Sequence, residues 1–361
     1  MNIVALLKYM IQKKGSDMHI RANGPVYIRV DGALEPIAGS ASNPKAVEEL
    51  AYKIMTPRAR KIFDESMESD FSFSGEGLGR YRVNAYRQRG LVALALRAVS
   101  AEIPSLDALM LPVEPLRKLA SARRGMVLVT GVTGSGKSCT LAAMIDYINQ
   151  ARDEHIITLE DPIEFLHRDK KSIITQREIG LDTNGFVEAL RAAMRQNPDV
   201  ILVGEMRDLE TTRAALSAAQ TGHLVFATLH TIDAVQTVTR IVDMFPPHQQ
   251  GQIRLQLADS LNGVVSQRLL PKIGGGRVPA IEILFVTGNV RKLIEENKNL
   301  GIAEAIQKGG YYGMQTFNQS LVQLHKQGLV TLEEAMAAAS NPDDFMLAVR
   351  GIQQGADAVP K

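Results

Sequence analysis

An eight-residue stretch, Gly131-Val132-Thr133-Gly134-Ser135-Gly136-Lys137-Ser138, follows an apolar run at 126–130 and precedes a helical pattern at 141–145. The spacing G-x-x-x-x-G-K-S between a strand and a helix is the context that a phosphate-binding loop requires. Glycines let the backbone N–H groups point inward at a helix N-terminus, where they attract anions. Lys137 would place its charge on the β- and γ-phosphates, and Ser138 would offer its hydroxyl to Mg²⁺. The stretch therefore predicts that the chain binds a nucleoside triphosphate.

The predicted nucleotide-binding residues are Gly131, Val132, Thr133, Gly134, Ser135, Gly136, Lys137, Ser138 and Cys139.

Bulk properties narrow the class of protein. The chain has 361 residues, longer than one hydrophobic core typically supports, so we expect two domains. Its formal net charge of +2 gives no basic field of the kind that nucleic acid attracts. Cys139 is the single cysteine, which excludes an internal disulfide or a multi-cysteine zinc site and fits a reducing cytosol. No window approaches the roughly 18 consecutive apolar residues of a membrane span.

Residues 1–102 predict a small α+β domain. Apolar residues at 3, 6, 7, 10 and 11 fall on one face of a helix that we expect to pack on its own domain. Residues 26–32 alternate and end in a turn signal, like the first arm of a hairpin. Helices are expected at 46–55 and 58–67, and strands at 70–73, 79–86 and 91–97. A proline-bracketed linker at 103–112 follows, and 113–361 forms the second domain.

In the second domain strands and helices alternate, which is typical of a parallel sheet with crossover helices. The expected strands are 126–130, 155–159, 172–176, 200–203, 224–228 and 280–285. Asn184 and Asp208 are expected to cap two of the helices. From Phe317 onward the pattern predicts short helices at 317–327, 332–339 and 344–350, with a frayed end at 355–361.

Two acidic stretches follow expected strands, where sites on such sheets gather. Glu160-Asp161-Pro162-Ile163-Glu164 places three carboxylates around a proline turn; it is either a solvated turn or one wall of a Mg²⁺–nucleotide site. In the second stretch an expected apolar strand is followed by Gly204 and Glu205. This resembles a Walker B pattern, in which an Asp would be usual at position 204. Glu205 could orient Mg²⁺ through water or activate the attacking water, and the spacing does not decide which.

Histidines and arginines supply the remaining candidates. His223 and His230 flank the strand at 224–228, and His230, at its carboxyl end, is the better candidate for contact with the γ-phosphate. Arg80 and Arg82 share one face of a strand in the first domain. They are either solvated or reach a neighbouring subunit's nucleotide, and the second reading requires an oligomer.

Taken in order, these motifs resemble those of the secretion-type (type II/type IV) ATPase superfamily and, within it, the pilus retraction (twitching-motility) ATPases of the PilT/PilU kind. The matching stretches beside the phosphate loop are 15–19, 79–84, 160–164, 190–199, 204–208, 223–230 and 313–317.

The resemblance implies a PAS-like N-terminal domain on a RecA-like P-loop ATPase core with a helical C-terminal tail, assembled as a homohexamer. Carried over by position, it implies Glu164 as catalytic base, Glu205 as the Walker B acid near Mg²⁺, and His230 as sensor. The implied cations are Arg82, Arg97 and Arg195. Relatives of this kind act at the cytoplasmic face of the inner membrane on a pilus platform protein, and meet the membrane only through such partners.

The absence of a tetracysteine module favours retraction over assembly or type II secretion. The C-terminal signature A-I-R-N-L-I of the retraction family is only partly present, at 289–294. Residues 167–177 look closer to the accessory PilU branch. The chain can therefore be a principal retraction motor or an accessory paralogue, and both alternatives remain open. A nucleic-acid translocase would use aromatic stacking residues, yet Trp is absent and aromatic residues make up 5% of the chain. A non-catalytic nucleotide-binding scaffold fits poorly, because the two acidic stretches and the stretch at 223–230 each contain a candidate acid or sensor.

Overall fold

The computed structural model describes residues 1–30 and 32–351, and these divide into two compact units. The first contains residues 1–102 together with 162–166, and the second contains 103–161 and the residues from 167 onward. Residues 103–112, expected to be a linker, belong to the second unit, where Leu106 and Leu111 are buried. The segment 162–166, which carries Glu164, packs with the first unit although both of its neighbours in the chain belong to the second. The expected frayed end at 355–361 lies outside the described residues.

The first unit is built on an antiparallel sheet in the order β3-β2-β1-β6-β5-β4. Its strands are β1 (Asp17–Arg21), β2 (Tyr27–Val30), β3 (Ala33–Pro36), β4 (Glu68–Gly75), β5 (Gly79–Gln88) and β6 (Leu91–Val99). Its helices are α1 (Ile3–Gln12), α2 (Pro44–Ile54) and α3 (Pro57–Ser66). The unit is therefore α+β, as expected. Strand β3 is the second arm of the hairpin whose first arm was predicted at 26–32, and β1 is a strand that the sequence pattern did not indicate.

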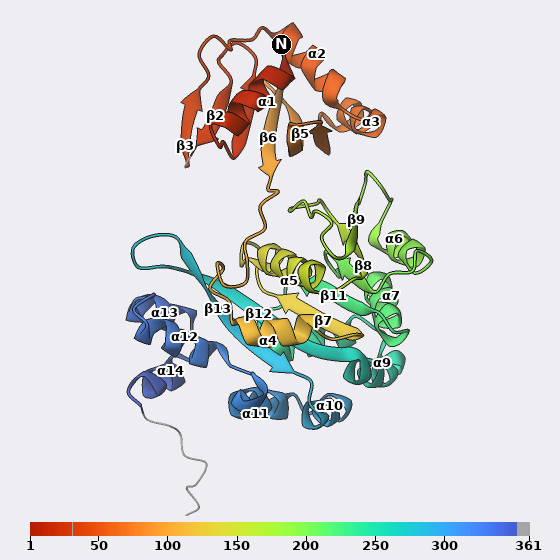
Figure 1. Ribbon diagram of the computed structural model, residues 1–361, viewed down its shortest axis with the longest axis vertical. Helices are drawn as coiled ribbons and strands as arrows, with labels where there is room; N and C mark the ends of the chain where they lie inside the picture. The colour runs from red at the N-terminus through yellow and green to blue at the C-terminus, as the bar shows by residue number, and fades with distance from the viewer. Residues whose placement is uncertain (31, 352–361) are drawn as a thin grey trace, which may run out of the picture. The chain divides into compact units, whose positions relative to one another are not determined.

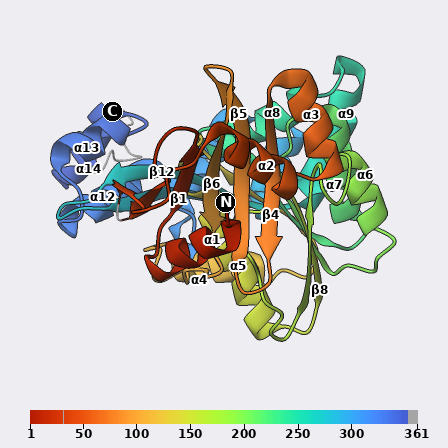
Figure 2. The ribbon, with the colours of Figure 1, turned by 90° about the horizontal axis from the view of Figure 1, so that it is seen from above.

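Side-chain alternation gives the first sheet one buried and one polar face. Met18, Val83 and Leu96 lie in the core that also contains Leu7 and Met10 of α1, which is drawn beside the sheet in Figure 2. Because successive side chains of a strand point to opposite faces, Asp17, Arg82 and Arg97 lie on the other face. They also stand in one row, since Asp17 is the register partner of Arg97 and Arg97 that of Arg82.

The second unit contains a sheet in the order β13-β12-β7-β11-β10-β8-β9, parallel except for β13. Its strands are β7 (Gly125–Thr130), β8 (His155–Glu160), β9 (Ile173–Glu178), β10 (Val200–Val203), β11 (Leu224–Leu229), β12 (Leu261–Pro271) and β13 (Arg277–Phe285). This is the predicted parallel α/β core. Strand β12, next to β7, is an addition to the expected set.

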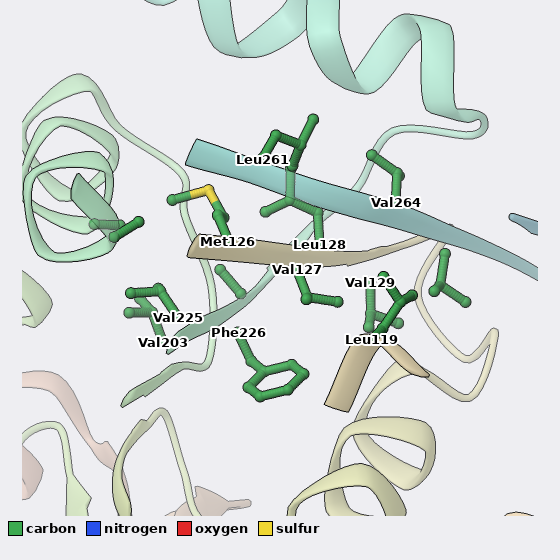
Figure 3. Packing of buried hydrophobic residues seen from close by; sticks show 14 of the residues in the cluster. Leu119, Met126, Val127, Leu128, Val129, Val203, Val225, Phe226, Leu261 and Val264 are labelled. Carbon is green, nitrogen blue, oxygen red and sulfur yellow. The ribbon is translucent and has the colours of Figure 1, made fainter. Parts of the chain in front are cut away.

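Helices flank this sheet (Figure 1). They are α4 (Val113–Ala120), α5 (Lys137–Ala151), α6 (Phe186–Ala193), α7 (Leu209–Gln220), α8 (Ala234–Asp243), α9 (Pro247–Ser260), α10 (Gly288–Glu295) and α11 (Asn299–Lys308), with a 3₁₀ turn at Gly310–Tyr312. Figure 3 shows Val127, Val129 and Phe226 on the same side of the sheet as Leu119 of α4. By alternation Met126 and Leu128 fill the opposite side, so β7 is buried along its whole length.

The end of the described chain forms helices α12 (Phe317–Lys326), α13 (Leu332–Ala338) and α14 (Pro342–Val349), close to the expected ranges. We call residues 317–349 the C-terminal tail. It packs on β12 and β13 through a separate apolar cluster that includes Leu270, Val278 and Phe317 (Figure 1).

One of the two expected helix caps is wrong. Asp208 caps α7 by accepting the N–H of Thr211 at 2.8 Å, as predicted. Helix α6, in contrast, has Gly185 rather than Asn184 as its N-cap, in an extended conformation and without a side-chain cap.

Candidate nucleotide site

The phosphate loop connects the carboxyl end of β7 to α5. Lys137 is the first residue of α5, and Gly136 precedes it with a φ of 93° and no side-chain cap bond. The first N–H groups of a helix have no partner within the helix, so they remain available to an anion. The local structure thus provides the uncapped helix start that phosphate binding needs.

Glycine is required at two places in the loop for different reasons. Gly131 has a φ of 142°, and a Cβ there would lie 2.5 Å from both the carbonyl oxygen of Gln267 and Oγ of Ser135. Gly134 has a φ of 79° but open space where a Cβ would stand. Position 131 is therefore closed by packing, whereas position 134 is restricted by backbone conformation alone.

Polar groups line the inside of the loop. Nζ of Lys137 donates to the carbonyl oxygens of Gly131 at 2.7 Å and Val132 at 3.0 Å. Among the described residues, the buried Oγ of Ser135 and Oε1 of Gln267 have no hydrogen-bond partner. A lysine turned onto loop carbonyls and a buried, unpaired hydroxyl fit a cradle built for phosphate oxygens.

Glu205 forms a charged cluster directly after β10. Its Oε1 lies 2.9 Å from Nε2 of His230 and 2.5 Å from Nε of Arg207. Thr228 fixes the turn by donating from Oγ1 to the carbonyl oxygen of Gly204 at 2.5 Å. The predicted pair of Glu205 and His230 therefore comes together at the carboxyl ends of the neighbouring strands β10 and β11.

The same contacts set the charge of Glu205. Partial burial favours its neutral form and raises the pKa, but the hydrogen bond from Arg207 and the charge of His230 outweigh that effect. The net pKa of Glu205 is lowered, so the side chain is a carboxylate at neutral pH. Ser138 and Glu205 offer oxygen atoms as ligands, and Mg²⁺ prefers oxygen ligands, so the residues present fit that ion.

The acidic stretch after β8 is divided between the two units. Glu160 stays at the strand end, where its Oε1 accepts from Oγ1 of Thr158 at 2.7 Å and from Nε2 of Gln176 at 3.1 Å. Glu164 lies in the first unit, where its Oε1 is 3.5 Å from Nη1 of Arg82. The predicted base and one predicted cation are therefore neighbours.

Arg97 has a different partner. Its Nε donates to Oδ1 of Asp17 at 2.7 Å. Burial raises the pKa of Asp17, but the hydrogen bonds from Arg97 and Ser16 lower it by more, so the net pKa is below its usual value. Arg82 and Arg97 are directly opposite each other in neighbouring strands, where like charges repel, so Glu164 and Asp17 each offset one of the two charges.

Two other candidates lie apart from these clusters. Arg195, two residues after the end of α6, donates from Nη1 to the carbonyl oxygen of Arg191 at 3.2 Å. Nδ1 of His223 lies 3.0 Å from the carbonyl oxygen of Ala218, at the amino end of β11 and so opposite the phosphate loop.

The structure adds residues that pattern reasoning did not select. Arg207 stood in a recognised stretch, but only the fold shows its ion pair with Glu205. Gln176 and Gln267 come from strands flanking the site, and an uncharged residue in a strand carries no sequence signal for this position.

A search of protein families matches residues 2–275 to the type II/IV secretion system protein family. The type IV pilus retraction ATPase PilT of Pseudomonas aeruginosa is 47% identical over 96% of this chain and 100% of its own length. PilU, a type IV pilus ATPase of the same organism, is 41% identical over 99% of this chain and 94% of its own length.

Among solved structures, the pilus retraction motor PilT with bound ADP has a TM-score of 0.88 and 49% identity, covering 95% of this chain and 98% of that one. Similarity of this extent includes both units and the loop between β7 and α5. The chain therefore belongs to the type II/IV secretion system protein family.

Proposed function

We propose that the chain is an ATP-hydrolysing motor that powers type IV pilus retraction. The observation that carries the proposal is the complete phosphate loop at the end of β7, with Lys137 directed into it, in a chain that aligns with PilT over 96% of its length. Among the residues that the structure describes, no helix is both long and apolar enough to cross a membrane. We place the motor at the cytoplasmic face of the inner membrane.

Binding begins at the loop. The phosphates of ATP take the N–H groups of residues 131–139, and Lys137 exchanges the carbonyl oxygens of Gly131 and Val132 for phosphate oxygens. Ser138 and Glu205 would hold Mg²⁺, which neutralises charge that develops on the phosphates when it is bound.

The acids divide the remaining work. A general base works best when its pKa lies near the operating pH, whereas the pKa of Glu205 is lowered by Arg207 and His230. This supports Glu205 as an electrostatic and Mg²⁺-orienting group and leaves proton transfer from water to Glu164. His230, already 2.9 Å from Glu205, is the proposed γ-phosphate sensor.

Arginine side chains from both units complete the proposal. Arg97 is held by Asp17, which supports a structural role, so Arg82 is the better candidate to meet phosphate charge. We propose that Arg82 and Arg195 act across the subunit interfaces of a homohexamer. The proposed partners are an inner-membrane pilus platform protein and a paralogous retraction ATPase.

The first test is biochemical. The purified chain should hydrolyse ATP in the presence of Mg²⁺, and Lys137→Ala should abolish turnover because it removes the phosphate-binding charge. Turnover that persists in Lys137→Ala would show that the activity does not arise at this loop.

The second test separates the principal motor from the accessory branch. The higher identity to PilT than to PilU supports the principal motor. Deleting the gene from its host should therefore give hyperpiliated cells that do not twitch. Cells without pili would indicate an assembly ATPase instead, and normal piliation with weakened retraction would indicate an accessory ATPase.

A further inference from the structure

Glu282 is a buried acid of β13 that holds the first residue of two helices. Its side chain accepts the N–H of Ala234, the first residue of α8, with Oε1 at 2.9 Å, and it also accepts the backbone N–H of Phe317, the first residue of α12. The residue is 8% exposed. Helix starts carry unpaired N–H groups and positive potential, so a carboxyl group is a suitable partner for both.

Each helix has its own cap for a later N–H group. Asp233 accepts from Gln236 at 2.7 Å at the start of α8, and Thr316 accepts from Gln319 at 3.2 Å at the start of α12. Glu282 is therefore an additional, shared partner, and its consequence is to tie α8 to α12.

Arg268 strengthens the same junction from the neighbouring strand β12. Its guanidinium lies 3.8 Å from the centre of the Phe317 ring and donates to the carbonyl oxygen of Ala338 at 2.5 Å. Its charge also attracts Glu282. The two residues thus hold the C-terminal tail against β12 and β13.

Helix α8 leads back to the nucleotide site. His230 directly follows the last residue of β11, and α8 begins four residues later at Ala234. The short connection is braced by a hydrogen bond of 2.7 Å between the hydroxyl groups of Thr231 and Thr237. Because β11 is fixed by its neighbours, the place where α8 starts limits where His230 can lie against Glu205.

The junction between α8 and α12 contains a buried ionisable group, and burying such a group carries a desolvation cost that an apolar side chain would not have. Burial and the nearby charge of Asp233 raise the pKa of Glu282, whereas the N–H groups of Ala234 and Phe317 and the charge of Arg268 lower it, and the net pKa is about 7. An apolar side chain would avoid this cost but would leave the N–H groups of Ala234 and Phe317 unpaired.

We propose that Glu282 is a positioning residue for the reaction: by tying the start of α8 to the C-terminal tail, it holds His230 in place against Glu205. This inference rests on the proposed ATPase function for its catalytic consequence. The positional part, that Glu282 holds the connection at 230–234, does not depend on it.

The test uses the full chain with Glu282→Leu and Glu282→Asp. Glu282→Leu should raise amide hydrogen exchange at both Ala234 and Phe317, because leucine has no acceptor. Glu282→Asp should raise it at one of the two at least, because its side chain is one methylene too short to reach both N–H groups. The kcat for ATP should fall about 10- to 100-fold with KM for ATP little changed, since a misplaced group near the reaction lowers rate more than binding. Glu282→Gln keeps a carbonyl acceptor and should restore most of the rate at neutral pH.

Two controls sharpen the result. Glu154→Gln changes another buried acid of the second unit. Glu154 precedes the amino end of β8, at the opposite end of the parallel strands from the phosphate loop, so this variant should leave kcat unchanged. Combining Glu282→Leu with His230→Ala should cost little more than His230→Ala alone, because coupled residues are not additive. The aspartate variant serves the same comparison if the leucine variant does not fold.

Unchanged kcat in folded Glu282→Leu or Glu282→Asp, or full additivity with His230→Ala, would overturn the proposal. A wild-type chain without ATP turnover would contradict the proposed function instead, and exchange at Ala234 would then decide the positional part alone.

Discussion

Glu205 shows how much one carboxylate depends on its neighbours. Arg207 and His230 both contact Oε1, and together they keep the side chain charged despite its partial burial. Glu164, by contrast, is about half exposed and pairs with Arg82 over 3.5 Å, a contact that solvent screens. Two acids that look alike in the sequence therefore occupy different electrostatic surroundings.

At this scale we predict that Glu205→Gln and Glu164→Gln each lower kcat by about 100-fold or more while retaining nucleotide binding. Glu205→Gln loses charge stabilisation, and Glu164→Gln loses the proton acceptor. Steady-state ATP hydrolysis and binding of a fluorescent ADP analogue measure the two effects separately. Wild-type turnover in either variant would remove that residue from the assignment.

At the scale of elements, the phosphate loop depends on the strand beside it. Gly131 packs against the backbone of Gln267 in β12, and Thr130 bonds to Ser266 of that strand at 2.8 Å. Strand β12 was absent from the expected set because its run at 261–271 interrupts apolar residues with Asn, Ser, Gln and Arg. Gln267 lies against the loop, Ser266 bonds to Thr130 at the end of β7, and Arg268 contacts the tail, whereas Asn262 donates to the carbonyl oxygen of Arg124 just before β7.

We predict that Gly131→Ala is far more damaging than Gly134→Ala. The first introduces a methyl group 2.5 Å from backbone and side-chain atoms, whereas the second meets open space and bears only the strain of its positive φ, about 1–2 kcal/mol. Gly131→Ala should lose nucleotide binding and lower the thermal midpoint by several degrees more than Gly134→Ala does. Equal midpoints and equal binding in the two variants would contradict the packing argument.

At the scale of the whole molecule, the ionisation of Glu282 makes stability depend on pH. Its pKa is about 7 in the folded chain and near 4.5 in the unfolded chain, so between these values the folded state binds more protons. Stability from this group therefore falls as pH rises from about 4.5 to about 7 and is level above that window. The lowered pKa values of Asp17 and Glu205 act with the opposite sign, because their contribution is lost as pH falls.

We predict that Glu282→Gln gains stability relative to the wild type as pH rises through this window, by an amount on the order of 3 kcal/mol. Comparing the two proteins cancels the groups that they share. Urea unfolding midpoints measured from pH 5 to pH 8 provide the comparison. A difference that stays constant over this range would show that Glu282 is ionised alike in the folded and unfolded chains.

The proposed ring gives a further prediction at this scale. Subunits with Arg82→Ala and subunits with Lys137→Ala are each inactive if Arg82 acts on a neighbour's nucleotide, but a mixture should recover activity at interfaces where intact groups meet. The measurement is ATP turnover of mixed preparations with subunit exchange verified by labelled chains. Activity that never exceeds the sum of the separate preparations would place Arg82 in its own subunit's site or outside the reaction.

The sequence by itself determined what depends on local spacing and periodicity. Glycines at 131, 134 and 136 followed by Lys137 specify a loop at a helix start, and alternating strands and helices specify a parallel sheet. Only the tertiary structure decided which distant residues meet. The segment 162–166 packs with the first unit, Arg97 is held by Asp17, and Glu282 joins two helices that begin more than eighty residues apart in the chain. Side-chain contacts across strands and helices follow from packing of the whole chain, and a pattern confined to neighbouring residues does not contain them.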